Sequence, residues 1–379
     1  MNLDLVFPRL PPALDGIGDY TARLAGALAA HARVRILTAE AAPAAIPGVE
    51  IRTAFGIAPP HGVARLAEAI DAAPPDWLGV QYNPFSYGRW GWNPHLPRTL
   101  RALRHRHPSV RLALTVHEVA PPLLNARLAL MSTWQLAHLW ALGRMADVVF
   151  AAIEPWVAPM RRWFGTSRVH HLPVGSNIPY APAGRAEARA ALGLPDPAFA
   201  VGVFGTAHPT RLLGFVRTTV ETLREAGADA RVLYVGPDGE AVRARLGGLP
   251  LLDAGRVPAR DVSRHFAAMD LYLAPFRRGV STRRGSFVAA LQHGVPTLAT
   301  AGSHTGALLR AAGGDAFALA PDDDAAAFAA QARALHSDPA RRAALGQAGR
   351  AFFARHHAWD VLAARLAGAL ALPTLTPAA

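Results

Sequence analysis

The sequence of 379 residues contains no cysteine and no lysine. Without cysteine it can form no disulfide, thiol nucleophile, iron–sulfur cluster or cysteine-ligated zinc site. Without lysine it lacks the lysine of a P-loop, of a protein kinase and of a pyridoxal Schiff base, and all 39 basic residues are arginines. These two absences exclude thiol chemistry and several large classes of nucleotide-dependent enzyme.

Long apolar runs are also missing. No run reaches the roughly 18 residues that span a bilayer, and the N-terminal segment lacks the basic start and apolar centre of a signal peptide. We therefore expect a cytoplasmic protein. The composition, 51% hydrophobic and 17% charged, provides for a large core, and the length favours two domains over one.

The formal net charge is +12, which raises the question of a nucleic-acid partner. The arginines are spread along predicted helices, and the chain has no basic tail, zinc-finger spacing or ribonucleoprotein motif. We therefore expect no nucleic-acid binding. The charge is attributed to solvated helix faces, and an anionic partner such as a membrane surface or a phosphorylated substrate stays open as the alternative.

Short apolar runs that predict strands alternate with segments of helical periodicity along the chain. The predicted strands are 3–7, 34–38, 49–53, 77–81, 112–116, 148–151 and 169–172 in the first half, and 199–204, 232–235, 251–254, 271–275 and 295–299 in the second. This alternation predicts βαβ units and parallel sheets. We expect an α/β protein of two doubly wound, Rossmann-like domains facing a cleft.

A connection rich in proline, alanine and arginine sets the expected domain boundary. We place the first domain at 1–177 and the second at 178–356. The remaining segment, 357–379, is expected to form a C-terminal helix that packs back on the first domain and ends in a loose tail.

Two glycine-rich turns each follow a predicted strand and precede an amphipathic helix: DGIGD at 15–19 and GVSTRRGS at 279–286. A helix N-terminus carries partial positive charge and unpaired amides, and glycine lets the backbone come close to a phosphate. The sequence therefore predicts two anion sites at the carboxyl ends of strands. The acidic run at 322–324 precedes an alanine-rich helix and is expected to cap it, and no histidine pair has metal-ligand spacing.

Several motifs, in order along the chain, resemble those of GT-B glycosyltransferases, particularly the large retaining group called family 4. They are DGIGDYTARLAGALAA with VRILT near the N-terminus, TVHEV at 115–119, LPVGSNI at 172–178, FGTAHPTRLL at 204–213, AGRVPARDVSRHFAAMDLYLAPF at 254–276 and HGVPTLAT at 293–300. The resemblance covers nearly the whole chain. It implies the GT-B architecture, with the acceptor received by the first domain and a nucleotide sugar by the second.

The implied reaction moves a sugar from a nucleotide-diphosphate donor to a glycan or lipid-linked acceptor, with retention of configuration. Front-face attack, in which the donor phosphate takes the acceptor proton, needs no carboxylate nucleophile. The implied co-substrate is the nucleotide sugar, with no metal and no other cofactor. The family resemblance and the basic charge together imply a role in assembling lipid-linked or exported polysaccharide at the inner face of a membrane.

Arginine suits a diphosphate because its planar, permanently charged fork makes bidentate contacts with phosphate. The resemblance implies that His117 contacts the donor sugar and that Arg211 holds the diphosphate, which makes these two the expected catalytic residues. A structural hydrogen bond is the alternative role for His117. The expected donor-binding residues are Gly16, Gly18, Thr206, Arg256, Val257, Gly279, Ser281, Thr282, Arg283, Arg284 and Ser286.

The predicted strand 77–81 leads into a loop, 81–92, that holds five aromatic residues. Aromatic faces stack on sugar rings, and exposed ones enter membrane interfaces. We expect this loop to recognise the acceptor, with contacts from Tyr82, Asn83, Arg89 and Trp90. Core packing is the alternative role for its aromatic residues.

The sequence departs from the family at one place. Most members carry two glutamates eight positions apart, and here Ser281 and Ala289 occupy those positions. We expect the serine- and arginine-rich loop to compensate by gripping phosphate more firmly. The substitution also keeps open a non-catalytic sugar-nucleotide-binding homologue, and an epimerase of the same two-domain shape is the competing enzyme class.

Overall fold

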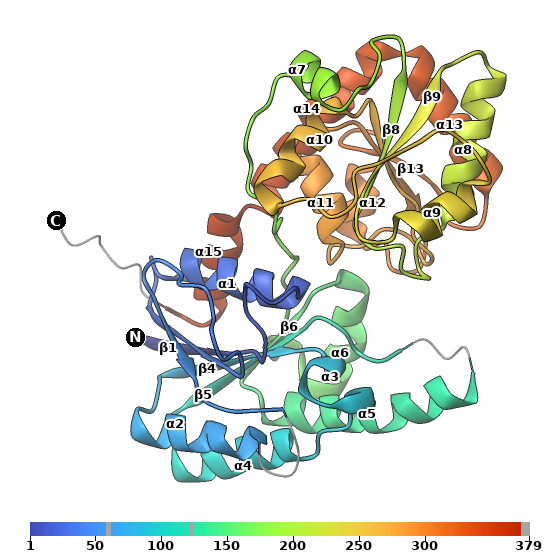
Figure 1. Ribbon diagram of the computed structural model, residues 1–379. Helices are drawn as coiled ribbons and strands as arrows, with labels where there is room; N and C mark the ends of the chain where they lie inside the picture. The colour runs from blue at the N-terminus through green and yellow to red at the C-terminus, as the bar shows by residue number, and fades with distance from the viewer. Residues whose placement is uncertain (58–61, 122–124, 373–379) are drawn as a thin grey trace. The chain divides into compact units, whose positions relative to one another are not determined.

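The computed structural model describes residues 1–57, 62–121 and 125–372. The chain forms two compact units (Figure 1). The first unit comprises Met1–Pro173 and Trp359–Ala379, and the second comprises Val174–Ala358.

The second unit begins at Val174 and ends at Ala358, a few residues from the expected boundaries after 177 and 356. Two hydrogen bonds account for the difference. The amide of Val174 donates to the carbonyl of Thr282 at 3.0 Å. The carbonyl of Val174 accepts from Nδ1 of His357 at 2.8 Å. These two bonds hold Val174 and His357 within the second unit.

The first unit is built on a seven-stranded sheet of order β3-β2-β1-β4-β5-β6-β7, in which every neighbouring pair is parallel. Its strands are β1 (Asn2–Val6), β2 (Arg33–Thr38), β3 (Val49–Thr53), β4 (Trp77–Tyr82), β5 (Arg111–Val116), β6 (Val148–Ala151) and β7 (Val169–His171). All six residues of the central strand β4 are buried. A parallel strand covered on both faces has this continuous apolar character.

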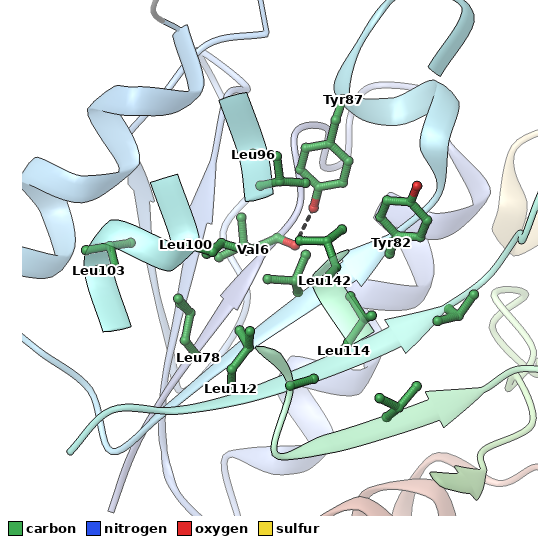
Figure 2. Packing of buried hydrophobic residues seen from close by; sticks show 14 of the residues in the cluster. Val6, Leu78, Tyr82, Tyr87, Leu96, Leu100, Leu103, Leu112, Leu114 and Leu142 are labelled. Carbon is green, nitrogen blue, oxygen red and sulfur yellow. Dashed lines mark hydrogen bonds between the residues drawn. The ribbon is translucent and has the colours of Figure 1, made fainter. Parts of the chain in front are cut away.

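Helices cover both faces of this sheet. They are α1 (Gly16–Leu28), α2 (Leu66–Ala72), α3 (Pro84–Tyr87), α4 (His95–Arg106), α5 (Ala126–Met145), α6 (Val157–Phe164) and α15 (Trp359–Ala369), with short 3-10 turns that include η2 (Arg89–Gly91). The main core cluster packs α2, α4, α5 and α6 against one face. Figure 2 shows part of it, in which leucines of α4 and α5 lie against β4 and β5. In it, the Tyr87 hydroxyl donates to the carbonyl of Val6 at 3.0 Å, which fixes α3 over the end of β1.

The last helix of the chain, α15, belongs to the first unit and packs against α1. The ring centroids of Tyr20 and Trp359 lie 5.4 Å apart at this contact. Residues 373–379, the expected loose tail, lie outside the described residues.

The second unit has a six-stranded parallel sheet of order β10-β9-β8-β11-β12-β13. Its strands are β8 (Phe199–Phe204), β9 (Ala230–Val235), β10 (Leu251–Asp253), β11 (Leu271–Ala274), β12 (Thr297–Ala301) and β13 (Ala318–Pro321). Its helices are α7 (Arg185–Ala191), α8 (Leu213–Glu225), α9 (Gly239–Leu246), α10 (Val262–Ala268), α11 (Gly285–Gln292), α12 (Ala307–Ala312), α13 (Ala325–Ser337) and α14 (Pro339–His356).

The prediction of two parallel-sheet α/β domains is confirmed. The capping role expected for the acidic run is also confirmed, because Oδ1 of Asp324 accepts from the amide of Ala327 at 2.8 Å. One strand was not predicted: β13 lies beside β12 at the sheet edge. Its sequence, Ala-Leu-Ala-Pro, has little strand propensity. The segment is a strand because it pairs with β12.

Candidate active site

Three loops of the second unit meet at the carboxyl edge of its sheet. They follow β8, β11 and β12, which are neighbours in the sheet. Because parallel strands end at the same edge, the residues after each strand are brought together there, although they are far apart in sequence. This edge holds most of the residues expected to bind the donor.

Arg211 is the most informative residue at this edge. Its side chain is 7% exposed, and its Nη2 donates to the carbonyl of Phe204 at 2.7 Å. Nη1 is buried without a hydrogen-bond partner, and no carboxylate lies within salt-bridge distance of Arg211 in the described part of the chain. A buried guanidinium without a counter-ion is costly, so this site is suited to an anion.

Arg284 and Arg211 both lie near the ring of Phe276. The two guanidinium carbons lie 4.3 Å and 4.8 Å, respectively, from the ring centroid of Phe276, and Nη2 of Arg284 donates to Oγ1 of Thr210 at 3.2 Å. Cation–π contact with one ring partly offsets the repulsion between two cations. The pair presents a concentrated positive charge at the start of α11.

Helix α11 begins directly after Arg284, which is its N-cap residue and accepts no side-chain cap hydrogen bond. Ser286, in the first turn, has its Oγ 3.4 Å from Nη2 of Arg211. An arginine at a helix N-terminus opposes the helix dipole. An anion bound there would relieve this repulsion and accept from the first amides of the helix.

Ser281 and Thr282 do not lie as expected. Both side chains are almost completely buried, and Oγ of Ser281 has no hydrogen-bond partner among the residues described. Both side chains support the loop in this arrangement, and their contact with a donor stays a prediction. The neighbouring Arg283 is half-buried.

Gly279 is needed for a close approach between two loops. It has φ +81°, and a Cβ there would lie 2.2 Å from the amide nitrogen of Gly302. Oγ1 of Thr305 donates to the carbonyl of Val280 at 2.9 Å and ties the same two loops together. The structure thus explains this glycine by packing, and its contact with a donor stays a prediction.

The pKa of His304 is lowered partly by the positive charge at this edge. Burial first, and then Arg283, Arg278 and Arg284, lower the pKa of His304 from 6.5 to about 4. A histidine surrounded by three arginines stays neutral at pH 7. Sequence patterns did not single out His304, because its environment arises from two different loops.

The remaining donor-side residues of the second unit are more exposed. Thr206 follows β8 and is exposed, and its carbonyl accepts from Nε of Arg211 at 3.2 Å. Arg256, which is exposed, and Val257, which is half-buried, follow β10. Since β9 separates β10 from β8, these two residues lie two strands away from the Arg211 loop.

In the first unit, His117 follows β5 and is buried. Its Nε2 lies 2.8 Å from Oε1 of Gln81, and its ring meets the ring of Tyr20 edge-on at 4.9 Å. Gln81 lies at the end of the neighbouring strand β4 and was not predicted as a site residue. A polar residue in an otherwise apolar strand was the signal that could have identified it.

The first glycine turn is a capped helix start. Oδ1 of Asp15 accepts from the amides of Ile17 and Gly18 at 2.9 Å and 3.0 Å. A Cβ on Gly18 would lie 2.6 Å from the carbonyl oxygen of Arg9, which explains that glycine by packing, whereas Gly16 is exposed. The amides of Ile17 and Gly18 are occupied here, so donor contact by this turn stays a prediction.

The loop expected to bind the acceptor divides into two parts. Tyr82 is a core residue (Figure 2), and its hydroxyl donates to the carbonyl of Gln135 at 3.4 Å. Core packing, the alternative role, accounts for Tyr82 in this arrangement, and its contact with an acceptor stays a prediction. Asn83 caps α3 by accepting from the amide of Phe85 at 3.0 Å, while Arg89 and Trp90 are exposed.

Two further observations concern metal ions and membranes. No group of three or more histidine, aspartate and glutamate side chains is placed to hold a metal ion in residues 1–57, 62–121 and 125–372. Over the same ranges, no helix is both long and apolar enough to cross a membrane.

Comparison with known proteins adds a family match and several structural likenesses. Residues 198–338 match the family model of group 1 glycosyl transferases, and this segment contains Arg211, Arg284 and α11. No curated protein matches the sequence.

Three solved structures illustrate the likeness. Sucrose-phosphate synthase from Thermosynechococcus elongatus superposes with a TM-score of 0.73 at 20% identity, covering 98% of both chains. HepE from Anabaena, in complex with UDP and glucose, gives 0.67 at 16% identity, and WaaG, a glycosyltransferase involved in lipopolysaccharide biosynthesis, gives 0.69 at 15%; each comparison covers 98% of this chain and 99% of the other. The two α/β units are therefore those of the GT-B fold, and the segment that matches group 1 glycosyltransferases lies within the second unit.

Proposed function

We propose that the protein transfers a sugar from a nucleotide-diphosphate donor to a glycan or lipid-linked acceptor, with retention of configuration. The observation that carries the proposal is the buried guanidinium of Arg211, which has no carboxylate partner in the described residues and lies beside Arg284 at the start of α11. Such a site calls for a ligand with more than one negative charge, and a diphosphate supplies it.

The proposed reaction breaks the bond between the anomeric carbon and the donor's phosphate oxygen. The acceptor oxygen bonds to the anomeric carbon on the same face, and its proton passes to the released phosphate oxygen. Negative charge grows on the diphosphate as the bond breaks, so Arg211, Arg284 and the first amides of α11 stabilise the transition state more than the bound donor. No metal and no further cofactor enter the proposal.

His117 is proposed to contact the donor sugar, with Gln81 holding its ring through the 2.8 Å contact at Nε2. A sugar hydroxyl would then meet a ring whose tautomer is set by the amide oxygen. Further donor contacts are proposed for Gly16, Gly18, Thr206, Arg256, Val257, Gly279, Ser281, Thr282, Arg283 and Ser286. Acceptor contacts are proposed for Tyr82, Asn83, Arg89 and Trp90.

Binding and turnover test the proposal in two steps. Calorimetric titration with UDP, GDP, dTDP and ADP should show binding of at least one, and the matching sugar donors should then be consumed in the presence of glycan or lipid-linked acceptors. The anomeric proton coupling of the product gives the configuration. Absence of binding by all four diphosphates would overturn the donor assignment, and an inverted product would overturn retention.

The second candidate is a protein that binds a sugar nucleotide without transferring the sugar. Ser281 and Ala289, which stand where most family members have glutamates, are both completely buried, so neither position offers a ribose contact in this arrangement. This candidate predicts diphosphate binding without donor consumption in any acceptor mixture. Turnover with one acceptor would reject it.

A lipid-linked acceptor would be met at a membrane surface. We therefore include cytoplasmic, peripheral membrane association and a role in polysaccharide assembly in the proposal. The net charge of +12 favours an anionic surface.

A further inference from the structure

Helix α5 exposes large apolar side chains opposite its buried face. One face buries Met131, Leu139 and Leu142 in the first unit. The opposite face exposes Leu130 and Trp140, which are 61% and 54% exposed, together with Leu136. A surface helix of a protein surrounded by water normally has a polar outer face. The outer face of α5 (Figure 1) therefore calls for a partner other than water.

Two tryptophans lie beside α5, one in the 3-10 turn η2 and one directly after it. Trp90 and Trp92 are 49% and 56% exposed. The carbonyl of Trp90 accepts from Nε1 of Trp134 at 3.1 Å and from Nε2 of Gln135 at 3.0 Å, and the rings of Trp92 and Trp134 meet edge-on at 6.0 Å. We call the five exposed side chains of Leu130, Leu136, Trp140, Trp90 and Trp92 the tryptophan face.

The backbone of Trp90 has an unusual conformation that hydrogen bonds from α5 hold in place. It has φ +56° and ψ +19°, a left-handed conformation that bulky residues rarely adopt. The two hydrogen bonds from α5 hold this conformation, and the next residue, Gly91, has φ +74° and packs against Gln135. Strain of this kind is maintained where it serves a function, and here it presents the ring of Trp90 at the surface.

The charges around the tryptophan face are positive. The guanidinium carbons of Arg89 and Arg127 lie 4.7 Å and 5.3 Å from the ring of Trp90, and that of Arg144 lies 5.8 Å from the ring of Trp140. A partner for this surface must therefore combine an apolar region with negative charge.

We infer that the tryptophan face binds the surface of a bilayer that contains anionic lipids. Tryptophan rings sit at the level of the head groups, and arginines lay their stems on apolar surface while their charges reach lipid phosphates. No helix in the described ranges is suited to spanning the bilayer, so α5 would lie along its surface. The inference deepens the membrane association in the proposed function by naming its surface, and vesicle binding tests it without sugar transfer.

Flotation with vesicles tests the inference directly. We expect the protein to bind vesicles of phosphatidylcholine mixed with phosphatidylglycerol, and to bind pure phosphatidylcholine about tenfold or more weakly, because each arginine near an anionic surface adds to the attraction. Emission from the exposed tryptophans should shift to shorter wavelength on binding. Raised salt should weaken the binding.

Paired variants separate the apolar and the charged contributions. Leu136→Ser with Trp140→Ser, and Arg127→Glu with Arg144→Glu, should each lower vesicle affinity about tenfold or more. The matched controls are Trp163→Ser, at an exposed tryptophan of α6, and Arg245→Glu with Arg333→Glu, at exposed arginines of the second unit. The controls should bind within about twofold of the wild type, because they lie outside the tryptophan face.

Three results would overturn the inference. Equal binding to vesicles with and without phosphatidylglycerol would remove the role of charge, and full binding by the Leu136→Ser, Trp140→Ser variant would move the contact elsewhere. Self-association that disappears in the same variant, without vesicle binding by the wild type, would assign the face to a second copy of the chain. Circular dichroism confirms that each variant is folded, and titration with nucleoside diphosphates tests the donor site separately.

Discussion

Nη2 of Arg211 lies 3.4 Å from Oγ of Ser286, so the loop after β8 touches the first turn of the helix that follows β11. The contact joins two segments 75 residues apart. It places a buried guanidinium beside the amides of a helix start, and these are two kinds of group that bind phosphate. The donor site can therefore be tested at each group separately.

Removing the charge of Arg284 should weaken diphosphate binding. We expect Arg284→Gln to lower the affinity for a nucleoside diphosphate about tenfold to a hundredfold, because a charge-assisted hydrogen bond contributes about 1.5–3 kcal/mol. Calorimetric titration measures the change, and Arg245→Gln on the exposed face of α9 is the matched control. Equal affinities of Arg284→Gln and the wild type would show that the diphosphate binds elsewhere.

The contact between His117 and Gln81 should matter for turnover more than for binding. We expect Gln81→Leu to lower kcat about tenfold with little change in diphosphate affinity, because the ring of His117 loses the group that orients it. Gln81→Glu keeps an acceptor at that position and should restore part of the rate. A loss of affinity equal to the loss of rate would indicate a general structural role instead.

Adding a methyl group at Gly279 should destabilise the second unit. A Cβ there would lie 2.2 Å from the amide nitrogen of Gly302, and φ is +81°. We expect Gly279→Ala to lower the free energy of unfolding by about 1–3 kcal/mol. Urea denaturation measures this, with Gly214→Ala as the control, since a Cβ at Gly214 would meet nothing within 4 Å. Unchanged stability would show that the two loops can separate.

The lowered pKa of His304 makes stability depend on pH. Burial and the nearby arginines hold it at about 4 in the folded state, against 6.5 for the unperturbed side chain. Between those values the unfolded chain binds a proton that the folded protein excludes, so stability falls as the pH drops from about 6.5 toward 4. We expect His304→Gln to reduce this dependence by up to about 1 kcal/mol per pH unit, since partial exposure screens the effect.

Urea denaturation between about pH 7 and pH 5 measures the dependence, and NMR titration of the ring gives the pKa itself. His105→Gln, at an exposed histidine of α4, is the matched control. A ring that titrates at its ordinary value would contradict the positive environment described for His304.

Arg189 provides a test of the second unit's packing. It is buried on α7, and its Nη2 donates to the carbonyl of Pro195 at 2.7 Å while Nη1 donates to Oδ2 of Asp270 at 3.1 Å. Arg189→Met keeps much of the volume but removes the donors to these acceptors, of which Asp270 keeps Arg185 and the amide of Ala200 as partners. We expect a loss of about 3–5 kcal/mol in the free energy of unfolding, measured by denaturation. A loss below about 1 kcal/mol would show that water replaces the guanidinium.

Much of the fold could be predicted because its signals are local. Continuous apolar runs such as β4 and β8, followed by segments of helical period, identify parallel strands and crossover helices without reference to distant residues. The weak cases lack that signal. β13 has two alanines among its four residues, so its pairing with β12, rather than its own sequence, makes it a strand.

In the candidate site, too, local signals could be found in the sequence, whereas contacts between distant segments could not. The family resemblance indicated Arg211, and the bidentate geometry of arginine with phosphate favoured Arg284; the contact of either with a diphosphate stays a prediction. The burial of Tyr82 and Ser281 could not be predicted, because burial depends on packing by residues distant in sequence, such as Gln135 at Tyr82. Gln81, Phe276 and His304 act through neighbours brought close only by the folded chain.

The placement of α15 bears on how the protein is made. Trp359 of α15 lies near Tyr20 of α1, so the helix that completes the first unit is synthesised after the whole of the second unit. The second unit, Val174–Ala358, is continuous and can fold as soon as it emerges. During translation the first unit therefore lacks the helix that packs against α1 until the second unit has been synthesised.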